Sequence, residues 1–376
     1  MREITTIEVS ALVNELQSIR GFYFDKFYEV GRGRFRFRLS RQGEKEELLC
    51  ILKHALNLTH YIEKGKQESN FYAAVRKRIT GYKIERIEQL NEDRIIKITA
   101  SRGEEEIGIV FEMFGKGNLL IVDKDMKILL AYTQAEFKDR SVRSGILYQP
   151  PQSKAVPLSM ANSQSVLRII SECKDKSTGI TAFLSKSMNI GALYIENAIA
   201  GSGVNTKEEV DKVSGEEAAR IAESIAAIKR YTTAPEPIVY RANGNAVDYA
   251  ICSISKYEGL ASIEAQHVGS LQEALDIYYH EITEENNRPE EAGEIKAIRK
   301  SLERQRELLK SVEEEEEHSR KAGETIFKNM ELLNKVISEL REKKRISVEE
   351  LQNMFPEIKI IGLDLKDKTV TIELRE

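Results

Sequence analysis

A long heptad pattern near residues 295–340 constrains this chain of 376 residues more than any other feature. Apolar residues recur there at alternating spacings of three and four, which predicts one long helix with an apolar seam. The seam turns polar in the middle, beside the glutamate run Glu313–Glu317, which is typical of a solvated face. The seam positions are Ile295, Ile298, Leu302, Gln305, Leu309, Val312, Glu316, Ser319, Gly323, Ile326, Met330, Leu333, Ile337 and Leu340.

An apolar seam of this length cannot stay exposed to water, so the helix needs a partner. Residues 347–376 follow it, with a capping box at Ser347 and Glu350 and a β-hairpin that turns at Lys366-Asp367-Lys368. Either a returning helix lies beyond residue 376 in a longer protein, or two copies pair as a homodimer. We favour the returning helix, because the hairpin lies where an antiparallel coiled coil would turn back.

Residues 1–155 have the pattern of an α+β domain built on an antiparallel sheet. Thr5 and Glu8 have the spacing of a capping box that opens a helix. Phe35, Phe37 and Leu39 alternate with arginines, which predicts a strand with one apolar and one basic face. Because aromatic residues are few, we expect the cores to rest on Leu, Ile and Val. Further predicted elements are a helix at Ser69–Ile79 and strands at Ile84–Leu90, Arg94–Ser101, Glu106–Phe114 and Asn118–Asp123.

The rest of the chain divides into four segments. Residues 156–232 are helical, and the helices Ile180–Ser187 and Ala192–Ala200 flank a tight turn that suggests a helix-hairpin-helix. Such a turn can offer backbone N–H groups to a nucleic-acid phosphate, although Asn189 replaces its usual first glycine. Residues 233–285 complete the N-terminal region, residues 286–346 form the coiled-coil helix, and residues 347–376 form a short helix and the hairpin. In 233–285 we predict strands at Ile238–Tyr240 and Ala250–Ser255 and a helix at Leu271–Tyr279.

Composition excludes several classes of protein. The three cysteines, Cys50, Cys173 and Cys252, are far apart, and the histidines are scattered, so we expect no disulfide framework, metal site or cofactor. The N-terminus has no apolar signal region, and no apolar stretch is long enough to cross a membrane, so we expect a cytoplasmic protein. Residues 1–150 hold 26 Lys and Arg against 22 Asp and Glu, a charge of +4, which hints at a polyanionic partner.

Four stretches of the chain resemble the NFACT family. They are Thr6–Leu16, Ile84–Leu90 with the Asp93–Ile96 that follows it, Phe111–Asp123, and Leu271–Tyr279. The order of strand block, paired helices, further strands and heptad helix also matches, so the resemblance covers essentially the whole chain.

The resemblance implies a fold and a role. It implies an N-terminal part similar to the first domains of formamidopyrimidine-type DNA glycosylases, a coiled-coil middle and, beyond this chain, an RNA-binding module. It also implies ribosome-associated quality control. Family members bind a large ribosomal subunit that holds stalled peptidyl-tRNA and recruit tRNA for mRNA-independent tailing of the nascent chain. The ribosome does the chemistry, so the resemblance implies a binding factor.

Asp93 and Arg94 match the family pair implicated in tRNA recruitment and tailing. The guanidinium could meet a phosphate while the carboxylate orients it. Alternatively, Asn91-Glu92-Asp93 is only a turn, and Arg94 is an exposed strand residue. Glu8 falls where the family usually has an aspartate that is also tied to tailing. Capping with Thr5 explains Glu8 equally well, and the two roles can coexist.

Basic residues on a strand and on a helix are candidates for RNA phosphate contacts. The alternative is that they form ordinary solvated surface. They are Arg32, Arg34, Arg36, Arg38, Arg76, Lys77 and Arg78.

We expect no enzymatic activity. Formamidopyrimidine-type glycosylases use an N-terminal proline amine as nucleophile, whereas this chain opens with Met1-Arg2-Glu3. The scattered His and Cys residues give no catalytic triad. The alternatives to the tRNA-recruiting role are a coiled-coil adaptor and a general RNA-binding protein without a role in tailing.

Overall fold

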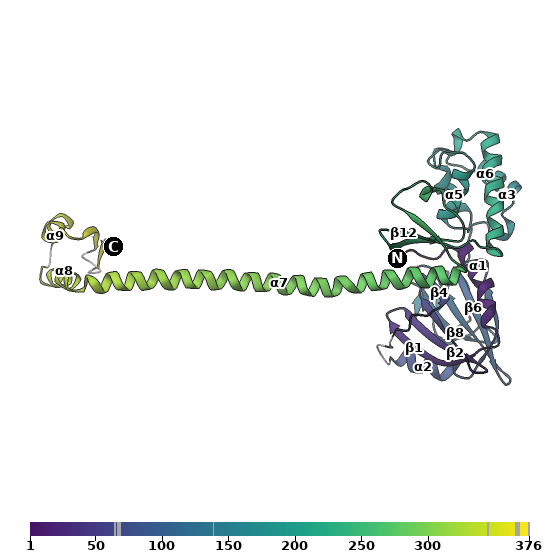
Figure 1. Cartoon of the computed structure of the whole chain (residues 1–376), viewed down its shortest axis with the longest axis horizontal. Coiled ribbons are helices and arrows are strands. Elements are labelled where there is room, and N and C mark those ends of the chain that lie inside the picture. Colours follow the sequence, from purple (N-terminus) through teal and green to yellow (C-terminus); the bar gives the residue numbers. More distant parts are fainter. Residues whose placement is uncertain (64, 66–68, 138, 344–345, 365–368, 375–376) are drawn as a thin grey trace. The chain divides into compact units, whose positions relative to one another are not determined.

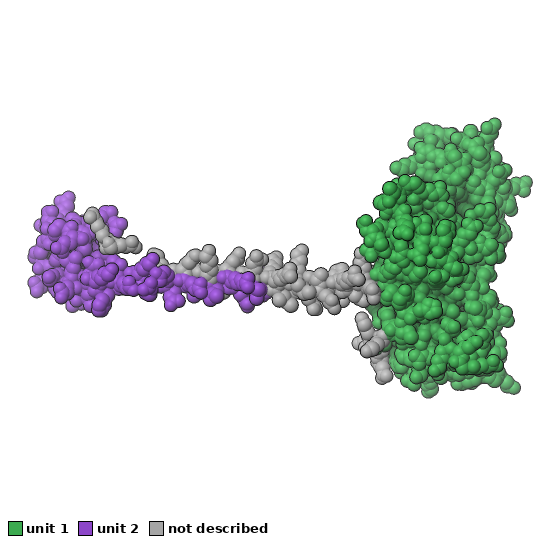
Figure 2. Space-filling view, viewed as in Figure 1, with its two compact units in different colours: residues 1–286 green, residues 287–376 purple. Residues whose placement is uncertain are grey.

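The computed structural model describes residues 1–63, 65, 69–137, 139–343, 346–364 and 369–374. The chain forms two compact units, Met1–Asn286 and Asn287–Glu376 (Figure 2). The division into five segments predicted from the sequence is finer than these two units and stays a prediction.

The first unit contains a nine-stranded antiparallel sheet in the order β4-β3-β2-β1-β5-β6-β7-β8-β9 (Figure 1). β1 and β5 join its two halves through the pair Tyr23 and Lys83. The strands are β1 (Tyr23–Gly31), β2 (Arg34–Arg41), β3 (Glu44–Ile51), β4 (Ala55–Leu58), β5 (Lys83–Gln89), β6 (Ile95–Arg102), β7 (Glu105–Glu112), β8 (Asn118–Asp123) and β9 (Ile128–Ala131). A separate small ladder pairs β10 (Ala135–Glu136) with β11 (Ser141–Val142).

The core beside this sheet contains a cluster of phenylalanines. Phe35 and Phe37 are fully buried on β2, which confirms the alternation predicted there. Phe27 on β1 lies 5.0 Å from Phe37, centroid to centroid, and Phe111 on β7 lies 5.9 Å from it. Leu, Ile and Val make up most of the buried core, as expected, and the few phenylalanines add a cluster on one face of the sheet. Helices α1 (Thr6–Glu15) and α2 (Asn70–Ile79) belong to the same unit.

Four helices and a second sheet complete the first unit. The helices are α3 (Ser163–Ser171), α4 (Ile180–Ser187), α5 (Ala192–Gly201) and α6 (Gly215–Ile228). The sheet has the order β13-β12-β14, with β12 (Ile238–Ala242), β13 (Asn245–Ala250) and β14 (Glu264–His267).

The strand predicted at Ala250–Ser255 is wrong beyond Ala250. β13 instead pairs with β12 across a turn at Asn243 and Gly244, both of which have left-handed backbone angles. Ile251, Cys252 and Ile254 are buried but lie outside the ladder. These apolar residues resembled a strand in the sequence because they are buried, although they pair with none of the strands that the structure describes.

Helix α7 (Leu271–Lys328) begins in the first unit and continues into the second, where α8 (Met330–Glu342) follows it. The predicted long helix is thus present but is interrupted at Asn329, between α7 and α8, whereas its pairing in a coiled coil stays a prediction. The second unit also contains α9 (Val348–Met354) and the hairpin strands β15 (Lys359–Asp364) and β16 (Thr369–Glu373).

The second unit has a small core of its own, in which Val336, Leu351 and Ile360 are buried. The predicted capping box at Ser347 and Glu350 opens α9. The predicted turn Lys366-Asp367-Lys368 lies outside the described residues. Among the helices that the structure describes, none combines the length and hydrophobicity that a membrane crossing requires.

Candidate functional site

Glu8 lies at the N-terminus of α1, where the sequence predicts a capping box. Its carboxylate accepts a 2.7 Å hydrogen bond from the backbone N–H of Thr5. It also accepts a 2.6 Å hydrogen bond from the Tyr194 hydroxyl on α5 and forms a 2.6 Å ion pair with Arg2. Glu8 has no exposed surface. Its carboxylate is therefore saturated by this chain and has no free path to a ligand.

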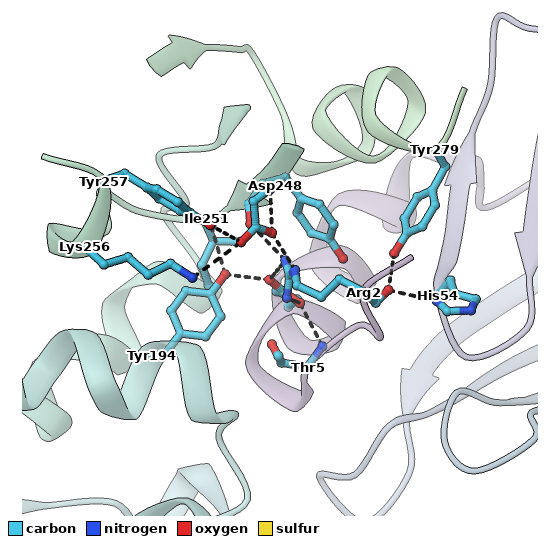
Figure 3. A network of polar contacts seen from close by, with 11 residues as sticks. Arg2, Thr5, His54, Tyr194, Asp248, Ile251, Lys256, Tyr257 and Tyr279 are labelled. Carbon is cyan, nitrogen blue, oxygen red and sulfur yellow. Dashed lines mark hydrogen bonds and ion pairs between the residues drawn. The ribbon is translucent and has the colours of Figure 1, made fainter. Parts of the chain in front are cut away.

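Arg2 lies at the centre of a largely buried polar network (Figure 3), and Glu8 is one of its partners. Its Nε lies 2.9 Å from the carboxylate of Asp248 on β13, and its guanidinium lies 3.9 Å from the centroid of the Tyr249 ring. Burial alone would lower the pKa of Arg2, but its partners, Glu8 foremost, raise that pKa well above the ordinary value. Arg2 therefore stays charged and holds α1 against the second sheet.

The Arg2 carbonyl ties the same segment to the first sheet. It accepts a 2.6 Å hydrogen bond from the Tyr279 hydroxyl on α7 and lies 2.8 Å from Nδ1 of His54, which follows β3 (Figure 3). Burial lowers the pKa of His54, so the neutral ring is favoured, with its Nδ1–H as the donor. With both ends of Arg2 fixed, the direction of the next residue, Glu3, is also fixed.

Arg94 is held by Glu3. A guanidinium nitrogen of Arg94 lies 2.9 Å from one carboxylate oxygen of Glu3, and the Lys53 ammonium lies 3.5 Å from the other. The Arg94 side chain is 29% exposed and that of Glu3 41%. Burial would raise the pKa of Glu3, but Arg94 and Lys53 outweigh it and lower that pKa. The three charges form a partly exposed, largely compensated cluster.

The Asp93 carboxylate binds the backbone of the turn, as in the turn alternative, and its role in tRNA recruitment stays a prediction. Its carboxylate accepts a 2.7 Å hydrogen bond from the backbone N–H of Arg94 and thus closes the β5–β6 turn. Asn91 and Glu92 have positive φ angles in that turn, which fits the turn chemistry seen in the sequence. In this geometry Glu3, and not Asp93, orients the guanidinium of Arg94.

The turn between α4 and α5 meets this region through Asn189. The Asn189 amide donates a 2.9 Å hydrogen bond to the carbonyl of Glu92, and its side-chain oxygen accepts a 2.9 Å hydrogen bond from the Thr6 hydroxyl. The backbone N–H of Asn189 donates to the Val156 carbonyl and so is not free for a phosphate. The helix-hairpin-helix assignment stays a prediction, and Asn189 serves here to join three segments.

Gly191 allows these segments to approach. Its φ of +126° is a backbone conformation that L side chains rarely adopt, and a Cβ atom there would lie 2.7 Å from Cβ of Thr5. The N-terminal segment (residues 2–8), the β5–β6 turn (residues 91–94) and the α4–α5 turn (residues 189–191) therefore form one tightly packed structure, which we call the junction. The resemblance pointed to Asp93, Arg94 and Glu8, and the junction contains all three.

Arg2, Glu3 and Lys53 were not predicted from the sequence as residues of this site. No local periodicity relates Glu3 to Lys53 or Arg94, because their contact arises only when the N-terminal segment crosses the end of the sheet. The one available signal was the charge of Arg2 and Glu3 immediately before a capping box.

The predicted basic strip on β2 is largely neutralised. Arg36 is buried and lies 2.7 Å from Glu47, which also binds Arg38 at 2.8 Å. Arg34 forms an ion pair with Glu63. Arg32 is exposed and has no ion pair within the part of the chain that the structure describes. Phosphate contact therefore stays a prediction, and the geometry supports it least for Arg36.

On α2 the basic residues differ in exposure. Arg76 and Lys77 are exposed, whereas Arg78 is half-buried and donates to the Ala74 carbonyl one turn back.

Groups that could hold a metal are not found among the described residues, where no three His, Cys, Asp or Glu side chains gather suitably. Cys50, Cys173 and Cys252 are buried free thiols, and burial raises the pKa of Cys252 to about 12. The expectations of no cofactor and no catalysis stay predictions.

A family model for the NFACT N-terminal and middle domains matches residues 5–375. The chain belongs to the NFACT family. A relative within this family, the archaeal Rqc2 homolog aRqcH of Methanocaldococcus jannaschii, is 24% identical over 360 residues, which cover 91% of this chain and 52% of the relative. The ribosome quality control complex subunit NEMF homolog of Drosophila melanogaster is 20% identical over 207 residues, or 53% of this chain and 20% of the relative. The chain thus spans about half the length of the archaeal NFACT protein.

Two solved structures share the fold of this chain. The fibrinogen binding protein from Staphylococcus aureus superposes with a TM-score of 0.59 at 20% identity, covering 73% of this chain and 98% of that one. The N-terminal part of the fibronectin/fibrinogen-binding protein from Streptococcus suis gives a TM-score of 0.55 at 18% identity, with the same coverage of both chains. At these identities the likeness concerns the fold alone.

Proposed function

We propose that this NFACT chain is a ribosome-associated quality control factor. It binds large ribosomal subunits that carry stalled peptidyl-tRNA and recruits tRNA for mRNA-independent extension of the nascent chain. Membership of the family supports the general role, since relatives are named as Rqc2 homologues or ribosome quality control subunits. Contacts with the subunit, with tRNA and with the peptidyl-tRNA belong to the proposal.

The observation that carries the proposal is the state of Arg94. Its guanidinium is partly exposed, and one carboxylate, Glu3, holds it at 2.9 Å. A guanidinium offers five N–H donors in one plane. The donors that Glu3 leaves unused can therefore form bidentate hydrogen bonds with a phosphate. Because Glu3 is itself anchored through Arg2, the guanidinium is presented in one orientation.

Glu8 contributes to this site indirectly. Its carboxylate is buried between Thr5, Tyr194 and Arg2 and so is poorly placed to contact tRNA. We infer that Glu8 is a positioning residue, which fixes the N-terminal segment and through it Glu3 and Arg94. The capping role and the functional role considered for Glu8 then coexist.

The protein acts, in this proposal, as a binding factor and not as an enzyme. The titratable groups of the junction are committed to one another, and a buried, ion-paired carboxylate such as Glu8 is a poor general base. Peptide-bond formation is left to the ribosome.

Helices α7 and α8 fit one half of a coiled coil in this role. Leu309, Ile326 and Ile337 on the predicted seam are 59%, 51% and 44% exposed, which is costly unless a partner covers them. We propose that a returning helix of a longer chain covers the seam, with pairing of two copies as the other arrangement. A size measurement on the chain distinguishes a monomer from a homodimer.

Two measurements test the proposal. The chain is sedimented with purified large subunits that carry peptidyl-tRNA, over a salt series, and tail addition is followed in a translation system. Arg94→Ala should abolish tail addition while most subunit binding remains, and Arg143→Ala, which removes an exposed arginine paired with Glu136, serves as the matched control. Tail addition that persists in Arg94→Ala would overturn the role of Arg94.

The second candidate function is a coiled-coil adaptor without an RNA role, favoured by the long helix alone. It predicts no salt-sensitive co-sedimentation with ribosomal subunits, even at low salt. A general RNA-binding protein would instead bind subunits without peptidyl-tRNA equally well.

A further inference from the structure

Helix α2 presents a basic face away from the core. Phe71, Val75 and Ile79 pack inward, with Val75 and Ile79 fully or almost fully buried. The residues three and four apart on the other side share one face of a helix and line a groove. They are Ser69, Tyr72, Ala73, Arg76, Lys77 and Thr80.

A second element completes this groove. Arg102, the last residue of β6, lines it together with the face of α2, and the open groove has a volume of about 640 Å³. Arg102 lies 4.6 Å from the centroid of the Tyr82 ring, which holds the long side chain along the wall. We call this the α2 groove.

The charges of the α2 groove are only partly compensated. Lys77 forms no ion pair within the described residues, and Arg76 reaches only the Tyr72 hydroxyl, at 3.5 Å. Arg102 pairs with Glu105 at 3.1 Å, but both side chains are more than half exposed, so water screens that pair. Among the residues that the structure describes, none that lines the α2 groove is acidic.

Helix stabilisation explains only part of this arrangement. Cations in the last turn of a helix interact favourably with its dipole, and this accounts for Arg76 and Lys77. It does not account for Arg102, which comes from a different element and lies beside these two cations. Arginine and lysine side chains are among the groups that proteins use to bind the phosphates of nucleic acids.

We propose that the α2 groove binds the phosphate backbone of RNA, as a contact separate from the junction. This rests on the proposed function and adds a second contact surface to it. Arg94 precedes β6 and Arg102 ends it, so the two sites lie about 27 Å apart at roughly 3.4 Å per residue. A partner that reaches both must be an extended polyanion, which suits an arm of a tRNA or a ribosomal RNA helix.

The test uses the 376-residue chain and bulk unacylated tRNA as the probe, with binding followed by fluorescence anisotropy over a salt series. The groove variant is Arg76→Gln with Lys77→Gln and Arg102→Gln. The matched control is Lys124→Gln with Lys174→Gln and Lys207→Gln, which removes the same charge from exposed positions elsewhere. Circular dichroism and the thermal midpoint establish that each variant is folded.

We expect the groove variant to bind tRNA at least about tenfold more weakly and to lower the slope of log K against log salt by about two. The control should stay within about twofold. Equal losses in both variants, or no loss in either, would overturn the α2 groove as an RNA site. So would equally tight, groove-dependent binding of a polyglutamate peptide, which would mark a site for acidic proteins.

The measurements distinguish an error in the α2 groove from an error in the proposed function. If the unaltered chain binds tRNA and only Arg94→Ala weakens it, the α2 groove is wrong and the junction stands. If the unaltered chain shows no salt-sensitive binding to tRNA or to ribosomal subunits, both fail.

Discussion

Glu3 forms a 2.9 Å ion pair with Arg94, although the two residues belong to segments that are far apart in the chain. Glu3 also lies 3.5 Å from Lys53, so one carboxylate faces two cations. Its own position depends on Arg2, whose guanidinium and carbonyl are both bound. The position of the partly exposed Glu3–Arg94 pair thus depends on the largely buried network around Arg2. Substitutions in the pair and in the network should therefore have different effects.

Glu3→Gln should strengthen tRNA binding while hardly affecting stability. The substitution removes a negative charge beside Arg94 and Lys53, so we expect about two- to fivefold tighter binding at low salt. The free energy of unfolding should fall by less than about 1 kcal/mol, because the pair is substantially exposed. Glu209→Gln, which breaks the exposed pair with Lys212, is the control. Weaker binding by Glu3→Gln would show that the orientation of Arg94 matters more than the charge.

Glu8→Gln should destabilise the protein strongly. It leaves Arg2, whose side chain is 20% exposed, with one fewer carboxylate, and breaking a largely buried pair typically costs about 3–5 kcal/mol. Denaturant unfolding measures this loss. If Glu8 acts by positioning, the tRNA affinity of the folded fraction should fall together with stability, and Glu8→Asp should recover part of both. A variant that keeps full stability and loses tRNA binding would point to direct contact by Glu8.

His54 predicts a pH dependence. Burial lowers the pKa of His54 in the folded state, so below about pH 6.5 the unfolded chain binds more protons at this site. The contribution of His54 to stability is therefore lost as pH falls from the unfolded pKa through the folded one. His54→Gln should reduce the slope of unfolding free energy between pH 7 and pH 5, whereas exposed His267→Gln should not. An unchanged slope in His54→Gln would contradict the assignment.

Gly191→Ala should disrupt the junction. The new Cβ would lie 2.7 Å from Cβ of Thr5, and the φ of +126° disfavours any side chain. We expect a loss of about 2 kcal/mol or more in unfolding free energy. Gly201→Ala is the matched control, since nothing lies within 4 Å of its Cβ position. Equal stabilities of the two variants would mean that the N-terminal segment can move away from Gly191.

Local patterns in the sequence predicted several elements because their causes are local. The alternation of Phe35 and Phe37 predicted a half-buried strand, and β8 has the predicted bounds Asn118–Asp123. The Thr5–Glu8 spacing predicted a capped helix, and the carboxylate of Glu8 does bind the N–H of Thr5.

Residue partners across the fold could not be predicted in this way. Arg36 carries a charge on a strand face expected to be solvated, but Glu47 on the neighbouring strand and the Tyr28 ring enclose it. The resemblance pointed to Asp93 and Arg94 but not to Glu3. The contact between Glu3 and Arg94 depends on how the N-terminal segment crosses the sheet. Long-range charge pairing leaves no period in a single sequence.

The network around Arg2 has a consequence for how the protein folds during its synthesis. Arg2 and Glu8 are synthesised early, but their partners Tyr194, Asp248 and Tyr279 leave the ribosome much later. Until Tyr279 emerges, Arg2 and the Glu8 carboxylate on α1 lack their full set of bonds. Contacts of such long sequence separation form slowly. The nascent N-terminal segment should therefore remain sensitive to protease until more than two-thirds of the chain has been made, and become protected in a single late step.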